Sequence, residues 1–83
     1  MAVASPNTLF DEVVDFLASA PRAEQIIAFE PSEALKERSH YLLERNRQDT
    51  LTTEERAELD EFSRLNHFVN MLKIRARQRL AKA

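Results

Sequence analysis

Residues 53–82 read TEERAELDEFSRLNHFVNMLKIRARQRLAK, the longest segment of the chain with a continuous helical pattern. It contains neither proline nor glycine, so nothing in it breaks a helix. Its apolar residues recur at helical spacing and fall within roughly 60° of one direction. They are Phe62, Leu65, Phe68, Val69, Leu72, Ala76 and Leu80. We therefore predict one helix over 53–82 that buries this stripe in the core.

This predicted helix is long for so short a chain. At 1.5 Å per residue it spans roughly 45 Å. A compact domain of 83 residues has a diameter of only about 30 Å. The C-terminal third of the helix must therefore project, fray or lie on another molecule.

The first upstream segment, residues 8–19, predicts a helix with a wide apolar face. Thr8 and Asp11 match the pattern of a capped helix start. Pro21 ends the helix, and residues 1–5 before it are expected to be disordered. The buried face is predicted to consist of Leu9, Val13, Phe16, Leu17 and Ala20, widened by Phe10 and Val14.

Two further helices are predicted over residues 22–28 and 31–47. The end of the first has strand propensity, but we favour a short helix because no second strand exists to pair with it. Pro31 suits the first position of the next helix. The inner face of that helix is predicted to hold Leu35, Ser39, Leu42 and Leu43, with His40 and Tyr41 near it.

The connection to the last helix carries two local signals. Asp49 is expected to take a left-handed dihedral, because no glycine is present to do so. Thr52 and Glu55 have the spacing of a capping box, in which each side chain bonds the other's backbone N–H. Together these signals predict a tight turn between two helices.

The composition supports an all-α fold in a single domain over residues 1–83, a small helical bundle with a long C-terminal helix. Glycine and cysteine are both absent, which removes glycine-dependent turns, disulfides and cysteine-based metal sites. No run approaches the ~20 apolar residues of a membrane span, and no signal-peptide pattern is present. We expect a cytoplasmic protein that does not contact a membrane.

Charge is distributed unevenly along the chain. Residues 67–83 hold five of the 12 cations and no acid, whereas residues 1–66 hold all 14 acids and carry a charge of −7. The basic end offers a nucleic-acid-binding alternative through Lys73, Arg75, Arg77, Arg79 and Lys82. The same cations also interact favourably with the negative C-terminal end of a helix dipole. Contact with an acidic protein and a solvated, stabilising tail are therefore two alternatives to nucleic-acid binding.

Met71 and Ile74 point away from the apolar stripe of the last helix, beside His67 and Gln78. Apolar residues on the wrong face of a helix indicate a second contact surface, although isolated exposed apolar residues are common. The predicted interface comprises Phe68, Met71, Ile74, Arg75 and Gln78. It would serve a homodimer or another partner protein.

The residues that could carry chemistry form no convincing site. His40 and His67 lie far apart in the sequence, and Glu37 with His40 supplies only one copy of the Glu-x-x-His motif that di-iron bundles repeat. The acids at 54–61 lack the spacing and central glycine of a calcium loop. They would also face phosphates if this were the recognition helix of a helix-turn-helix protein. We expect no catalytic residues, no metal and no cofactor.

Four segments resemble a known family. They are residues 26–34 (IIAFEPSEA), 42–47 (LLERNR), 50–55 (TLTTEE) and 76–80 (ARQRL). Their order resembles a family of small, uncharacterised bacterial helical proteins that is frequent in cyanobacteria, over Glu24 to Leu80. Members often read NREGTLT at the turn, whereas here Asp49 stands where glycine is usual. Such proteins are often encoded beside nuclease or toxin-like genes, so the resemblance implies an accessory or antitoxin-like role.

These observations predict a function in binding. The first hypothesis is a non-catalytic protein-interaction module, either antitoxin-like or accessory to a nuclease. The alternative is a nucleic-acid-binding protein that uses the basic C-terminal helix. An enzyme would need an enclosed polar pocket, which a bundle this small rarely provides.

Overall fold

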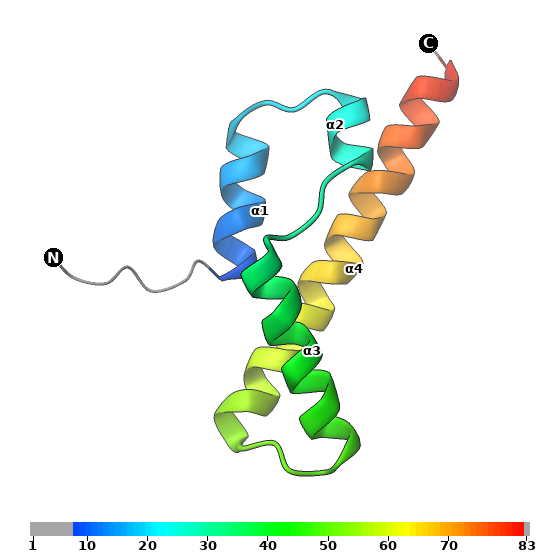
Figure 1. Cartoon of the computed structure of the whole chain (residues 1–83). Helices are drawn as coiled ribbons and strands as arrows, with labels where there is room; N and C mark the ends of the chain where they lie inside the picture. The colour runs from blue at the N-terminus through cyan, green and yellow to red at the C-terminus, as the bar shows by residue number, and fades with distance from the viewer. Residues whose placement is uncertain (1–7, 83) are drawn as a thin grey trace, which may run out of the picture.

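A computed structural model describes residues 8–82, and these residues form four helices and no strand. The helices are α1 (Leu9–Ala18), α2 (Ala23–Ile27), α3 (Glu33–Arg47) and α4 (Thr53–Lys82). Figure 1 shows α4 as a diagonal rod, with α1 and α2 beside its upper part and α3 crossing it below. The all-α prediction and the single unbroken final helix are confirmed. The disorder expected for residues 1–5 lies outside the described residues.

Side-chain caps fix where three of the helices begin. Thr8 and Asp11 form a reciprocal capping box at the start of α1. Thr52 and Glu55 do the same before α4, with both bonds at 3.0 Å. The expectation for the third helix was wrong by two residues, because Ser32 and not Pro31 marks the start of α3. The Ser32 hydroxyl accepts the Leu35 N–H, which satisfies one of the unpaired donors of the first turn.

The ends of α1 and α3 rely on left-handed residues. Asp49 has φ 59°, as the sequence predicts. The Asp49 and Thr50 N–H groups bond the carbonyls of Asn46 and Arg45, which is the full Schellman pattern. Ala20 also has φ 55°. The sequence analysis placed Ala20 on the buried helix face, and this is wrong because α1 ends at Ala18 and Ala20 makes the turn into Pro21.

The core is a single cluster gathered along α4. Leu9 and Val13 come from α1, and Leu35 and Leu42 come from α3. These four pack with Leu59, Phe62 and Val69 of α4, and Leu42 is fully buried. Burial of apolar side chains stabilises a fold by roughly 25 cal/mol for each Å² of apolar surface removed from water. Because the core cluster is gathered along α4, most of this stabilisation depends on α4.

The short helix α2 is more than a connection between α1 and α3. It packs extensively along the C-terminal half of α4, as Figure 1 shows. Ala76 of α4 is buried at this level. The C-terminal third of α4 is therefore partly covered, and exposure is continuous only from Arg77 onward.

Several residues assigned to the core are exposed. Leu43 is 50% exposed, and Phe68 and Leu80 of the α4 stripe are 45% and 39% exposed. His40 and Tyr41 also face solvent. Helical periodicity identifies which face of a helix is apolar. A residue on that face is buried only where another element packs against it at the same position along the helix. Leu59 was not assigned to the stripe, yet it is buried where α3 packs on α4.

The described part of the chain is thin and extended. Its Cα radius of gyration is 15.0 Å, against about 12 Å for a compact domain of this length. Its extents are 47 × 36 × 17 Å, and the shortest of them exceeds the diameter of one helix with its side chains, which is about 10–12 Å. The Glu12 carboxylate of α1 accepts the Ser32 N–H at 2.9 Å, which ties α1 to the cap of α3. None of the described helices has the length and apolarity to cross a bilayer.

Candidate interaction surface

An apolar groove of about 390 Å³ runs between α1 and α4. We call the residues that line it the α1–α4 surface. Four come from each helix, and the two charged ones, Glu61 and Arg64, form an ion pair at 3.3 Å. The full set is Phe10, Val13, Val14, Leu17, Glu61, Arg64, Leu65 and Phe68.

The groove is flanked by large apolar side chains that no part of residues 8–82 covers. Phe10 is 51% exposed, and Val14 and Phe68 are each 45% exposed. Val13 is buried and Leu17 is half-buried, so α1 uses only part of its apolar face against its own chain. Contiguous exposed apolar side chains on a small protein mark a contact surface.

Phe10 and Val14 were missed as surface residues because their positions only widen the apolar face of α1. The signal that could have found them was the width of that face. Seven apolar residues in so short a segment cover a broader arc than one neighbouring helix can bury. Since α1 packs mainly against α4, the outer part of the arc stays in solvent.

The predicted interface residues are all exposed, but they do not form one patch. Phe68 lies on the α1–α4 surface. Met71 is 39% exposed and Ile74 is 45% exposed, and each is turned further from α1 by the helical rotation of about 100° per residue. Arg75 and Gln78 are exposed on the next turn. The structure therefore places Phe68 beside α1, and Arg75 lies on nearly the same face of α4 two turns later, whereas Met71, Ile74 and Gln78 are turned further round the helix.

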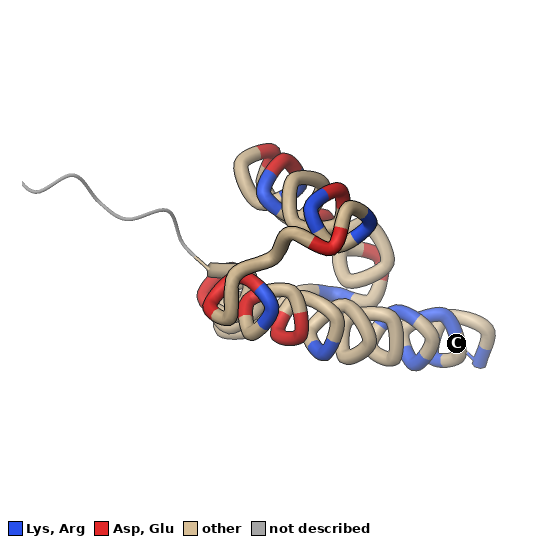
Figure 2. The backbone as a smooth tube through the Cα atoms, turned by 90° about the horizontal axis from the view of Figure 1, so that it is seen from below, with Lys and Arg blue, Asp and Glu red and all other residues tan. Residues whose placement is uncertain are grey.

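The predicted basic residues lie at the free end of α4, as Figure 2 shows. Arg75, Arg77, Arg79 and Lys82 are exposed, and none of them forms an ion pair with another residue in the range 8–82. Lys73 is half-buried instead, and lies near Glu30. A hydrogen bond from Lys36 is the main cause that lowers the pKa of Glu30, and the charge of Lys73 adds to it. Lys73 therefore interacts with an acidic residue of its own chain, whereas the other four cations form no ion pair within residues 8–82.

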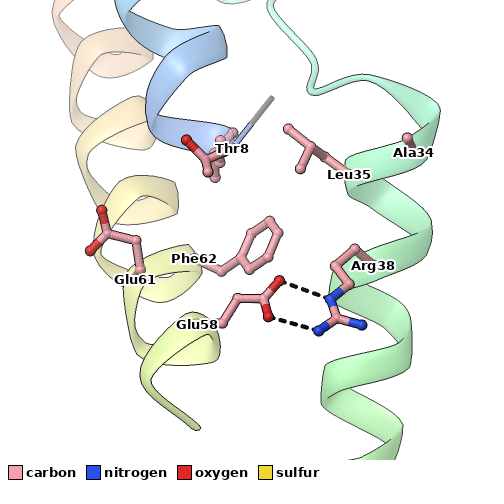
Figure 3. A pocket seen from close by; sticks show the side chains of 8 residues that line it. Thr8, Ala34, Leu35, Arg38, Glu58, Glu61 and Phe62 are labelled. Atoms are coloured by element: carbon pink, nitrogen blue, oxygen red, sulfur yellow. Dashed lines mark hydrogen bonds and ion pairs between the residues drawn. The ribbon is translucent and has the colours of Figure 1, made fainter. Parts of the chain in front are cut away.

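A second pocket, also of about 390 Å³, opens between α1, α3 and α4 (Figure 3). Its walls are mainly apolar, and the ion pair of Arg38 with Glu58 lies at its edge, with two N–O distances of 2.8 Å. The lining residues are Thr8, Leu9, Ala34, Leu35, Arg38, Glu58, Glu61 and Phe62. Because Arg38 and Glu58 satisfy each other, the pocket presents no unpaired charge for a reaction.

A cluster of charged and aromatic side chains joins α3 to the start of α4. The Tyr41 ring lies 5.1 Å from the Arg38 guanidinium and 5.5 Å from that of Arg45. The Tyr41 hydroxyl donates to Glu55 at 3.3 Å. The pKa of Glu55 is lowered first by its bond from the Thr52 backbone N–H, and that of Glu58 by its bonds from Arg38. These shifts are explained by structural pairing, so they do not identify an acid or base for catalysis.

The residues considered for metal binding do not converge. Glu37, His40 and His67 are all exposed. Within residues 8–82 no group of three His, Cys, Asp or Glu side chains is placed to hold a metal ion.

Comparison of the chain with models of protein families, with curated proteins and with solved structures gave no match in any of the three. The resemblance to small bacterial helical proteins therefore stays a prediction.

Proposed function

We propose that this chain is a non-catalytic protein-interaction module that binds an amphipathic helix of a protein partner along the α1–α4 surface. The observation that carries the proposal is the exposure of Phe10, Val14 and Phe68 around one groove. Binding of a helix in a groove uses apolar anchors on successive turns, and aromatic residues contribute most of the affinity at such contacts.

The open part of α1 supports the same proposal. Phe10 and Val14 are 51% and 45% exposed in the described chain, so residues 8–82 leave part of the apolar arc of α1 uncovered. A docked helix would bury that arc.

We further propose a class of protein partner. The sequence resemblance favours a nuclease or toxin-like protein, which would make this chain an antitoxin-like or accessory protein. Since the chain has no cysteine, it is compatible with a reducing compartment, and we propose that it works in the cytoplasm.

Site-specific photocrosslinking in the native host tests the proposal. A photoreactive phenylalanine analogue replaces Val14 in one variant and Leu43 in another, two positions of similar exposure on different helices. We expect position 14 to give a defined crosslinked protein and position 43 to give none. The crosslinked protein, once purified, should bind the wild-type chain and bind Phe68→Asp at least about tenfold more weakly.

The proposal is wrong if positions 14 and 43 give the same products or if neither gives any. It is also wrong if the purified partner binds Phe68→Asp as well as it binds the wild type, because the groove would then not be the contact.

A second candidate function, nucleic-acid binding, is favoured by the unpaired cations of α4. Arg75, Arg77 and Arg79 are exposed near a free helix end that residues 8–82 do not neutralise. Replacing these three with alanine should abolish a gel shift seen at low salt, and binding should fall steeply as salt rises. The absence of any shift by the wild-type chain at low salt would reject this candidate.

A further inference from the structure

The outer side of α4 carries an ordered series of exposed residues. Positions 54, 61, 68, 75 and 82 are seven residues apart, so they lie on one face of the helix. Along that face the residues run acid, acid, aromatic, base, base, as Glu54, Glu61, Phe68, Arg75 and Lys82. All five are exposed. This face of α4 is therefore open along its whole length.

The series is complementary to itself when it is reversed. Phe68 lies at the middle of α4 (Thr53–Lys82). If two copies of α4 run antiparallel and meet at Phe68, Glu61 of each copy lies opposite Arg75 of the other. Glu54 of each likewise lies opposite Lys82 of the other. A parallel arrangement would instead place like charges against each other, so the charges select one direction.

We propose that the helix that occupies the α1–α4 surface is α4 of a second copy of this chain, antiparallel to the first and centred on Phe68. This inference rests on the proposed function: the groove remains the helix-binding site, and its occupant is a second copy of the chain and not a nuclease or toxin-like protein. The arrangement is a two-fold symmetric dimer, in which the same patch of both copies forms the contact.

The apolar residues agree with this register. About Phe68, Leu65 of one copy lies opposite Met71 of the other, which accounts for the 39% exposure of Met71 in the single chain. Phe10 and Val14 of α1 border the groove beside Phe68, so they would contact the incoming helix. The contact then has an apolar centre with charged pairs toward both ends, the usual anatomy of an antiparallel helix pair.

Sedimentation equilibrium tests the inference, with a matched control. We expect the wild-type chain to be a dimer at micromolar concentration. Phe68→Asp should raise the dimer dissociation constant about tenfold or more, because it places a charge at the centre of the contact. Leu43→Asp puts the same charge at a position of similar exposure on α3, and it should leave the dissociation constant unchanged. A monomeric wild type at high micromolar concentration would overturn the inference.

Exchange of charges then tests the antiparallel register. One variant carries Glu54→Lys with Glu61→Lys, so its face is entirely basic, and the other carries Arg75→Glu with Lys82→Glu, so its face is entirely acidic. Each alone should associate about tenfold more weakly than the wild type, because every pair becomes repulsive. An equal mixture should recover wild-type affinity as a heterodimer, which native mass spectrometry distinguishes by mass.

Recovery in the mixture also shows that both variants are folded, so a loss in each alone cannot be attributed to misfolding. If each variant alone dimerises as well as the wild type, the charges do not set the register and the inference fails. Failure here leaves the proposed function separately testable, since a crosslink from position 14 to a different protein would support the groove with another helix in it.

Discussion

Asp49 and Ala20 show how single residues end helices in a chain without glycine. Both have positive φ, at 59° and 55°, where an L-amino acid with a Cβ is destabilised by roughly 1 kcal/mol or more. Asp49 was identifiable from sequence because it is the residue in a short polar connection that best tolerates this region. Ala20 was not, because alanine carries no signal for a left-handed dihedral.

Asp49→Gly should stabilise the fold by about 0.5–1 kcal/mol, since glycine adopts the left-handed region without the Cβ penalty. Urea unfolding would measure this as a higher midpoint with an unchanged slope. Asp49→Val supplies the opposite control, because a β-branched residue is least suited to positive φ. A lower midpoint for Asp49→Gly would show that the aspartate side chain stabilises the fold by more than its positive φ destabilises it.

Glu58 makes part of the stability dependent on pH. Its hydrogen bonds from Arg38 lower its folded pKa below the ordinary value of 4.5. Its contribution is therefore fully present above 4.5 and is lost as the pH falls through the lowered folded pKa. Because both side chains are more than a third exposed, the pair contributes less than about 1 kcal/mol.

Glu58→Gln should accordingly be slightly less stable than the wild type at neutral pH. The difference should shrink as the pH falls through the lowered folded pKa of Glu58, because protonation of the wild-type carboxylate removes the charge of the pair. Urea unfolding of both proteins at neutral pH and at about pH 3 measures it. A difference that stays constant between the two pH values would mean that the ion pair is not its source.

At the scale of the element, most of the helices were predictable because their signals are local. Capping boxes, Pro21 and the unbroken run after Thr52 all act within a few residues. The extent of burial was less predictable. Leu43 and Phe68 occupy apolar positions on their helices, but whether a neighbouring helix reaches them is decided by residues far away in the sequence. For the same reason, the packing of α2 on α4 could not be predicted from the sequence.

Thr52→Ala should destabilise the protein by about 1 kcal/mol, because it removes the hydroxyl that accepts the Glu55 N–H at the start of α4. Since α4 supports the whole core, the loss should appear in global unfolding and not only as fraying of the first turn. Thr53→Ala is the matched control, as it removes the same group one residue later, inside the helix. Equal losses from the two variants, measured by thermal unfolding, would contradict the assignment of Thr52 as the cap.

At the scale of the whole molecule, three shorter helices pack on one long helix, and the described chain has a smallest extent of 17 Å. The mismatch between a helix of about 45 Å and a small domain was evident from the sequence. The position of the open surface was not, because it depends on how α1 is set against α4. The interface residues chosen from sequence followed α4 alone, so they included Phe68 but not Phe10 or Val14.

Thiol protection measures directly whether a second copy of the chain covers the α1–α4 surface. The chain has no cysteine, so Val14→Cys and Leu43→Cys each introduce a single reactive thiol at sites of similar exposure. As protein concentration rises through the micromolar range, the thiol at position 14 should react progressively more slowly while that at position 43 keeps its rate. Equal, concentration-independent rates at the two positions would contradict the account.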